Sequence, residues 1–280
     1  MLSFVIFLWG SSFTLLKLGL DELPPITLAF LRSLIALPLL IVFAYHQDRK
    51  VLGSQFLQGW KVFSVLGLMG VTLYHVSQNI GLQLTTASNS SLIISSNPVF
   101  IALLDHLYIK ERITIKRIVG IFMAFVGIVL VIRPLEWSLD PLGLIGDLLS
   151  LGAALCWAVY SVMCKKVLSD HESGSITLYS MAYGTLFLFP VALVFERPTL
   201  PTSIWIWSLL LALSVFSSAL AYLLWSKALE NVSATTAGSF LFFLPVISIS
   251  VAYFVLSEVL DTSFAIGAAL VVIGVVMTNC

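Results

Sequence analysis

Residues 60–80 read WKVFSVLGLMGVTLYHVSQNI, a mostly apolar run without an acidic residue. About 20 predominantly apolar residues are what an α-helix needs to cross the hydrocarbon core of a membrane. The stretch at 207–227, WSLLLALSVFSSALAYLLWSK, follows it at a shift of 147 residues, with Trp207 over Trp60. The rest of the fold is predicted from these two features, a membrane-spanning helix and its second copy.

The composition excludes an ordinary soluble domain. Hydrophobic residues make up 59% of the 280 residues and charged residues only 10%, whereas soluble domains carry roughly 25% charged residues. So few charges cannot cover a surface that faces water, and lipid must therefore be the main solvent of this chain. The net charge of +0 argues against a nucleic-acid partner.

Ten apolar runs have the length or composition of a membrane span, and the connections between them are short and polar or contain Pro. No connection is long enough for a soluble domain. We therefore predict an all-α integral membrane protein of ten transmembrane helices. The predicted spans are Leu2–Leu18, Ile26–Ala44, Trp60–Ile80, Ser88–Tyr108, Arg117–Ile132, Leu142–Met163, Ile176–Phe195, Ile204–Ser226, Ala234–Leu256 and Phe264–Thr278.

The second half of the sequence repeats the first. A gap-free shift of 147 places Pro98 on Pro245, and a shift of 148 places Trp9 on Trp157. Chance aligns apolar letters easily, but it rarely aligns Trp, Pro, Glu and Gly in one register. Further pairs at the shift of 147 are Leu82 with Leu229, Glu111 with Glu258, Gly120 with Gly267, and Gly127 with Gly274.

Residues 1–133 and 142–280 are therefore interpreted as two copies of a five-helix unit around a central cavity. Because five is odd, the second copy must enter the membrane inverted relative to the first. Inverted repeats are a recurring design of secondary transporters, in which a site at the repeat interface opens to either side in turn. The duplication thus predicts a carrier that works by alternating access.

The basic residues predict the orientation, because cytoplasmic loops carry an excess of Lys and Arg. Ten basic residues fall on one side of the predicted spans, and only Lys17, Arg133 and Arg197 fall on the other. We therefore expect both termini in the cytoplasm. The expected location is the plasma membrane, specifically a bacterial inner membrane.

Short motifs recur in a fixed order in both halves. The first copy contains WGSSF at 9–13 and ERIT at 111–114, and the second contains GDLL at 146–149 and WAVY at 157–160. In this ordered set the chain resembles the drug/metabolite transporter superfamily, specifically its ten-helix EamA-type permeases. Each motif is weak alone, but the set covers essentially the whole chain.

The resemblance implies a basket of ten helices with a central cavity lined mainly by helices 1, 3, 4, 6, 8 and 9. It also implies export of amino acids or related metabolites as a common activity. The second copy departs from the pattern, because Ser257-Glu258-Val259 lacks the Arg that follows Glu in the first copy. The Glu in helix 1 that small multidrug members use for proton coupling is also absent, so drug antiport by that device is not expected.

Polar and aromatic residues inside the spans predict where a solute binds, because polar groups are costly in lipid. His75, Gln78 and Asn79 share one helix face, and the repeat places His75 over Tyr222 and Gln78 over Trp225. Hydrogen bonds between helices would explain the same residues, but the repeat selects these positions independently. Such a pocket suits a partly apolar zwitterion or an aromatic metabolite. The predicted cavity residues are Trp9, Ser12, His75, Gln78, Asn79, Asn97, Trp157, Tyr160, Ser218, Tyr222 and Trp225.

Two prolines and four glycines recur at equivalent positions in the two halves of the sequence. Pro98 and Pro245 are predicted hinges, because Pro breaks the helical hydrogen-bond ladder and paired interruptions mark transport sites; a static kink is the alternative. Gly127 and Gly274, each with a glycine seven residues before it, are predicted to allow close helix contact.

Four ionisable residues within the spans are candidates for coupling or for an ion pair. Arg32 and Asp147 lie toward the outer ends of their spans, where a structural ion pair is the simpler interpretation. Asp105 lies near the cytoplasmic end of its span, where it would contribute to an inner gate. Histidine is the side chain that ordinarily changes charge near neutral pH, and His75 is deeply placed in its span, so we expect it to be the first candidate for proton coupling.

No sequence motif indicates an enzyme: H-E-x-x-H, G-x-S-x-G and the P-loop pattern are all absent. We expect no cofactor and no metal. The leading hypothesis is an exporter of amino acids or related small metabolites. The alternatives are a nucleotide-sugar or sugar-phosphate carrier, which needs several basic residues in its cavity, and a non-transporting membrane protein. The expected partners are a small metabolite and the lipid bilayer, and the expected state is a monomer or a weak homodimer.

Overall fold

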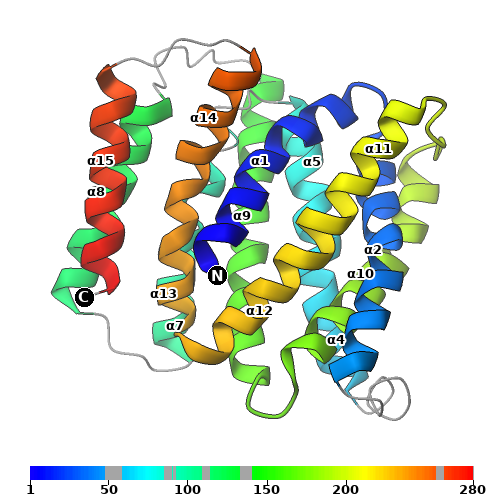
Figure 1. The fold of residues 1–280 in the computed structure, drawn as a ribbon, viewed down its shortest axis with the longest axis horizontal. Coiled ribbons are helices and arrows are strands. Elements are labelled where there is room, and N and C mark those ends of the chain that lie inside the picture. Colours follow the sequence, from blue (N-terminus) through cyan, green and yellow to red (C-terminus); the bar gives the residue numbers. More distant parts are fainter. Residues whose placement is uncertain are drawn as a thin grey trace.

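The computed structural model describes residues 1–47, 59–84, 90, 93–108, 114–132, 141–256 and 262–279. Within these ranges the regular structure consists of α-, π- and 3₁₀-helices. The helices lie side by side in one bundle, with α8 and α15 at one edge and α2, α10 and α11 toward the other (Figure 1).

Five of the described helical segments are long and apolar enough to cross a membrane. The longest, α9, has 27 residues and a length of about 40 Å at 1.5 Å per residue, which exceeds the hydrocarbon core of about 30 Å. The five are α1 (Leu2–Leu20), α2 (Pro25–Gln47), α9 (Pro141–Val167), α10 (Ser173–Phe195), and the continuous segment of α11 (Ile204–Ala212), η2 (Leu213–Leu220) and α12 (Ala221–Asn231).

The remaining predicted spans also consist mostly of helix where the structure describes them, although several are composite and Ser88–Tyr108 contains a turn at 95–96. The third span contains a π-helical segment, and the ninth contains a 3₁₀ turn. The elements are α4 (Trp60–Gly67), η1 (Leu68–Leu73), α5 (Tyr74–Leu84), α7 (Asn97–Tyr108), α8 (Ile115–Ile132), α13 (Ala234–Ser239), η3 (Phe240–Phe243), α14 (Leu244–Leu256) and α15 (Thr262–Asn279).

The α-helical pattern is interrupted directly before both Pro98 and Pro245. Pro98 is the second residue of α7, after a turn at Ser95–Ser96, and Pro245 is the second residue of α14, directly after the 3₁₀ segment η3. A helix tolerates Pro in its first turn because the N–H groups there have no intrahelical partner. The helices therefore restart at these prolines, and both copies use the same position.

Glycines bring α8 and α15 into close contact along their lengths. A Cβ on Gly127 would lie 2.6 Å from the carbonyl oxygen of Gly267, and one on Gly274 would lie 2.5 Å from that of Gly120. Such distances leave no room for a side chain, so the prediction of close packing at these glycines is confirmed. The closing helices of the two copies pack against each other through equivalent residues.

The first turn of α2 is capped by a residue from far along the chain. Glu196, which follows α10, accepts hydrogen bonds from the backbone N–H groups of Ile26 and Thr27, both 2.8 Å long, and from the Thr27 hydroxyl. The first N–H groups of a helix lack intrahelical acceptors and carry a partial positive charge, so a carboxylate there is stabilising. This contact joins the start of α2 to the end of α10, which also packs along it.

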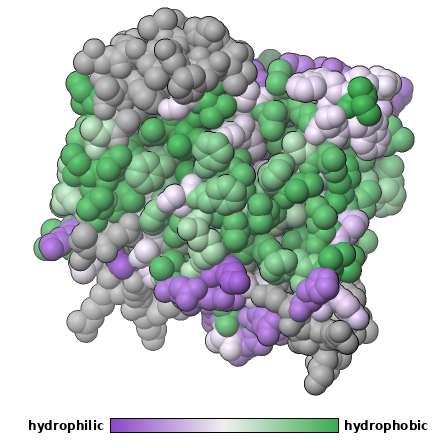
Figure 2. Space-filling model, in the orientation of Figure 1, coloured by the Kyte–Doolittle hydropathy of each residue, from purple (hydrophilic) through white to green (hydrophobic). Residues whose placement is uncertain are grey.

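The outside of the bundle is apolar. Hydrophobic side chains cover the middle of the face in Figure 2, and hydrophilic residues gather near its edges. Large side chains such as Phe7, Phe122 and Leu186 are exposed. Exposed apolar area on this scale is typical of a surface covered by lipid rather than by water.

Candidate substrate cavity

A small cavity lies inside the bundle, between α1, α2, α5, α7, α9, the η2–α12 segment and the junction of η3 with α14. Its volume is about 20 Å³ for the centre of a water-sized sphere, which is room for one or two water molecules. The lining combines aromatic rings, polar side chains and one Arg. The lining residues are Trp9, Ser12, Phe13, Leu16, Arg32, Tyr74, His75, Gln78, Asn97, Trp157, Ser217, Tyr222, Leu241 and Leu244.

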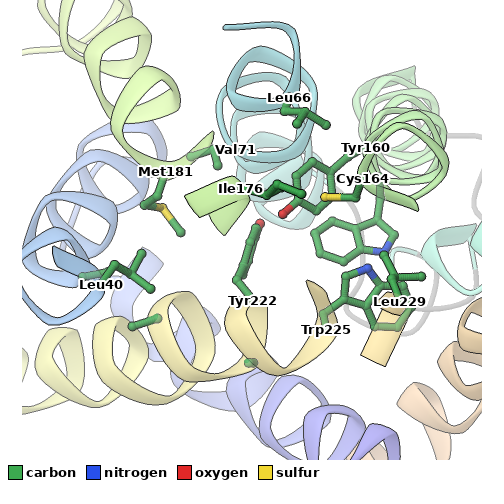
Figure 3. Packing of buried hydrophobic residues seen from close by; sticks show 14 of the residues in the cluster. Leu40, Leu66, Val71, Tyr160, Cys164, Ile176, Met181, Tyr222, Trp225 and Leu229 are labelled. Atoms are coloured by element: carbon green, nitrogen blue, oxygen red, sulfur yellow. The ribbon is translucent and has the colours of Figure 1, made fainter. Parts of the chain in front are cut away.

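The cavity is small because aromatic rings from both halves fill the space around it. Trp9 meets Trp157 edge to face, with ring centroids 4.9 Å apart, and lies 5.9 Å from Tyr222. Trp225 packs behind them, at 5.5 Å from Trp9 and 5.7 Å from Trp157. Aromatic pairs in these arrangements contribute about 0.5–1.5 kcal/mol each beyond the burial of their area. Tyr222 projects from α12 toward Tyr160 of α9, and Trp225 of the same helix lies near Leu229 (Figure 3).

Hydrogen bonds connect one wall of the cavity from α2 to α1. The Arg32 guanidinium donates to Ser218 Oγ at 2.9 Å and to Ser217 Oγ at 3.4 Å. Ser217 in turn donates to Ser12 Oγ at 3.3 Å. The indole N–H of Trp9 donates to the carbonyl oxygen of Ser217 at 3.1 Å. Ser217 therefore joins the cation to the aromatic cluster.

A second polar group joins α12 to η1. The Tyr222 hydroxyl donates to the carbonyl oxygen of Gly70 at 2.7 Å and lies 3.3 Å from Nε2 of His75. Because its proton is directed at Gly70, the phenol oxygen is left to accept from an Nε2–H of His75. In that tautomer Nδ1 of His75 is an acceptor, and this buried atom has no partner in the described structure.

Several other buried polar atoms beside the cavity also lack a partner within the described residues. They include Oδ1 of Asn97 and Nε1 of Trp157. An unsatisfied buried polar group costs roughly 1–3 kcal/mol, and such groups in a cavity mark places where a solute or water would gain a hydrogen bond. The cavity therefore offers both donors and acceptors to an occupant.

The sequence-predicted residues divide into two groups. Those that line the cavity are Trp9, Ser12, His75, Gln78, Asn97, Trp157 and Tyr222. The other four lie next to it or hold it in place. Asn79 donates to the carbonyl oxygen of Pro25 at 2.9 Å and so ties α5 to α2. Ser218 accepts from Arg32, while Tyr160 and Trp225 are fully buried in the packing around the rings.

The ionisable residues proposed for coupling separate in space. Arg32 lines the cavity and bonds to two serines, and no acidic side chain among the described residues pairs with it, so the expected Arg32–Asp147 ion pair is not formed here. Asp105 accepts from the backbone N–H and the hydroxyl of Thr235, at 3.0 and 2.7 Å, and so joins α7 to the start of α13. Asp147 lies half-buried in α9 and does not line the cavity.

Sequence reasoning missed two polar lining residues, Tyr74 and Ser217. The repeat pairs Tyr74 with Ala221 and Ser217 with Gly70, so neither position has a polar side chain in both copies. Tyr74 precedes the selected residue His75, and Ser217 precedes the selected Ser218. Adjacency to a selected residue was therefore the available signal.

The fold and the cavity define an all-helical membrane protein with a polar and aromatic centre. Comparison with known proteins adds its family. The sequence model of the EamA-like transporter family matches residues 1–133 and 144–280. An uncharacterized transporter of Archaeoglobus fulgidus is 34% identical over 287 residues, which cover 100% of this chain and 96% of the relative. The uncharacterized transporter YyaM of Bacillus subtilis is 29% identical, with 100% and 92% covered.

A crystal structure with 21% sequence identity superposes with a TM-score of 0.82 over 99% of this chain and 94% of that one. At this identity the likeness supports the fold alone. The family match shows that the chain belongs to the EamA-like transporter family, and the resemblance to the drug/metabolite transporter superfamily is confirmed. The protein is a multi-pass membrane transporter.

Proposed function

We propose that this transporter exports amino acids or related small metabolites across the plasma membrane by alternating access of two inverted five-helix repeats. The observation that carries the proposal is the position of the cavity. It lies between the two halves and is lined by repeat-related residues, Trp9 with Trp157 and His75 with Tyr222. A site at the interface of two repeats is what alternating access requires.

The small volume of the cavity supports a closed conformation in this cycle. At about 20 Å³ the space holds water but no amino acid, because the rings of Trp9, Trp157 and Tyr222 pack against one another. Separation of the halves on one side would draw these rings apart and expose them to a solute. The same rings would then supply the apolar contacts of the binding site.

The arrangement of the helix connections supports the inversion. The connection from α1 to α2 lies at the upper edge of Figure 1, and the connection from α9 to α10, its repeat equivalent, lies at the lower edge. Equivalent loops at opposite ends of the bundle are expected if the copies enter the membrane in opposite senses. The helix restarts at Pro98 and Pro245 then serve as matched hinges, one in each half.

A nucleotide-sugar or sugar-phosphate carrier is disfavoured by the charge of the cavity. Such substrates carry several negative charges and need several basic residues around them. Arg32 is the one Lys or Arg among the described lining residues. A substrate with at most one unbalanced negative charge fits this lining better.

The test is flux in proteoliposomes with labelled amino acids, with and without a proton gradient. Gln78→Ala should reduce flux, because Gln78 lines the cavity, while Gln83→Ala on the same helix should not, because Gln83 is exposed. His75→Ala should flatten any dependence on the proton gradient. Equal flux in the two Gln variants would contradict the site, and no flux of any compound across a broad metabolite panel would contradict the function.

A further inference from the structure

Arg32 is a cation enclosed in the middle of an apolar bundle. Its side chain is 4% exposed and lines the cavity. It bonds to the neutral hydroxyls of Ser218 and Ser217, and no described acidic residue balances its charge. The remaining guanidinium N–H groups have no partner among the described residues.

An isolated buried charge is strongly unfavourable unless a counter-charge and hydrogen bonds compensate it. Within membrane spans such residues mark solute or ion pathways for this reason. Among the described residues the hydrogen-bond partners of Arg32 are neutral hydroxyls, so a bound anionic solute would supply the compensating negative charge. The planar guanidinium fork matches a carboxylate, which accepts two of its N–H groups side by side.

We propose that Arg32 binds the carboxylate of the transported molecule, and that the substrates are compounds with a single carboxylate attached to an aromatic or apolar body. This inference rests on the proposed transport function and narrows its substrate class. The serines accept hydrogen bonds from Nε and Nη2 of Arg32. The N–H groups on the other side of the guanidinium are therefore left for the ligand.

The rest of the cavity suits the other parts of such a molecule. The rings of Trp9 and Trp157 form an apolar wall on which an aromatic or aliphatic group packs. Asn97 and His75 line the same space, and the acceptors Oδ1 of Asn97 and Nδ1 of His75 have no partner among the described residues. They would accept from an ammonium or hydroxyl group of the substrate, so an amino acid fits as well as a simple carboxylic acid.

The experiment measures binding to the purified full-length protein in detergent by the fluorescence of the cavity tryptophans. The ligands are phenylalanine, 3-phenylpropionate and phenylalaninamide, which share a phenyl ring. The first two carry a carboxylate, and the third carries a carboxamide in its place. Both acids should bind the unmodified protein, and the amide should bind about tenfold more weakly or worse, as expected for a lost charge-assisted pair.

The variants are Arg32→Gln, Arg32→Lys and the control Lys17→Gln. Lys17 is an exposed cation of α1 outside the cavity. Arg32→Gln should weaken the acids at least about tenfold without affecting the amide, Arg32→Lys should lie between, and Lys17→Gln should match the unmodified protein. If Arg32→Gln does not fold, the acid–amide comparison in the unmodified protein and in Arg32→Lys decides.

The proposal is overturned if the amide binds as tightly as the acids, if neither acid binds, or if Arg32→Gln keeps the preference for acids. Flux measurements separate this outcome from failure of the function itself. Transport of the amide or of other solutes that lack a carboxylate, without transport of acids, would leave the carrier intact and refute the role of Arg32. Absence of flux for every compound in the panel would refute the proposed function.

Discussion

Trp9 connects the two halves of the molecule through a single side chain. Its ring packs on Trp157 of the second copy, and its indole N–H donates to the carbonyl oxygen of Ser217 at 3.1 Å. Trp157 occupies the equivalent position, but its own N–H has no partner within the described residues. Two tryptophans related by the repeat therefore have similar packing and different hydrogen bonding.

This difference predicts unequal effects of one substitution. Trp9→Phe removes a hydrogen bond and leaves the Ser217 carbonyl without its indole donor, so it should lower the free energy of unfolding by about 1 kcal/mol beyond the lost ring area. Trp157→Phe should cost the ring area, offset in part because the variant removes a buried N–H that has no partner among the described residues. Thermal unfolding midpoints in detergent check this, and equal midpoints for the two variants would show that the hydrogen bond contributes nothing measurable.

At the scale of residues, agreement between the two copies predicted part of the cavity lining, although Tyr160 and Trp225, selected in the same way, do not line it. Trp9, Trp157, His75 and Tyr222 were selected because the repeat places polar or aromatic residues at both positions, and all four line the cavity. Arg32 has no basic counterpart in the second copy, so its place in the wall could not be read from the repeat. Its partners come from η2, far along the chain, and only the tertiary fold brings them together.

At the scale of elements, the two π-helical segments are equivalent in the two copies. The repeat maps η1 into η2, and Gly70 onto Ser217. Each of these residues uses its carbonyl oxygen to accept from a ring in the aromatic cluster, Gly70 from Tyr222 and Ser217 from Trp9. π-Helical segments are rare and often lie at functional sites. No residue pattern in the sequence predicted them, because they depend on how the helices pack.

The cap on α2 predicts a stability effect far from the cavity. Glu196→Ala removes the acceptor of two backbone N–H groups and one hydroxyl, so it should lower the free energy of unfolding by about 1–2 kcal/mol. Glu172→Ala is the matched control, because Glu172 precedes α10 without a side-chain cap bond. Unfolding midpoints should fall for the first variant only, and a similar fall in both would argue for a general charge effect.

Gly127 in the contact between α8 and α15 and Gly152 in α9 predict opposite effects on stability when each is replaced by Ala. Gly127→Ala places a methyl group 2.6 Å from the Gly267 carbonyl, so the helices must separate and stability should fall by about 1–3 kcal/mol. At Gly152 the nearest atom to an added Cβ is 4.0 Å away. Gly152→Ala should therefore be neutral or stabilising by up to about 1 kcal/mol. Midpoints in detergent measure both, and loss of stability in both variants would contradict the packing argument.

At the scale of the whole molecule, the proposed five spans in each copy would require equivalent loops to lie on opposite sides of the membrane. Composition and hydropathy predicted a helical membrane protein directly, and the duplication added the proposal of inversion. Which side each loop faces follows only from the bias in basic residues. That bias comes mainly from the first half of the chain, so the orientation of the second half needs its own measurement.

Asp21 and Ser169 are equivalent at the shift of 148 and are both exposed, one after α1 and the other after α9. In a chain with Cys156, Cys164 and Cys280 replaced by Ser, Asp21→Cys should react with a membrane-impermeant maleimide from outside the cell. Ser169→Cys should react only after the membrane is opened, because inversion places it in the cytoplasm. The two sites differ little in sequence context and accessibility, so a difference in labelling reports topology rather than reactivity. Labelling of both from the same side would mean that the copies insert the same way, and alternating access by inverted repeats would have to be abandoned.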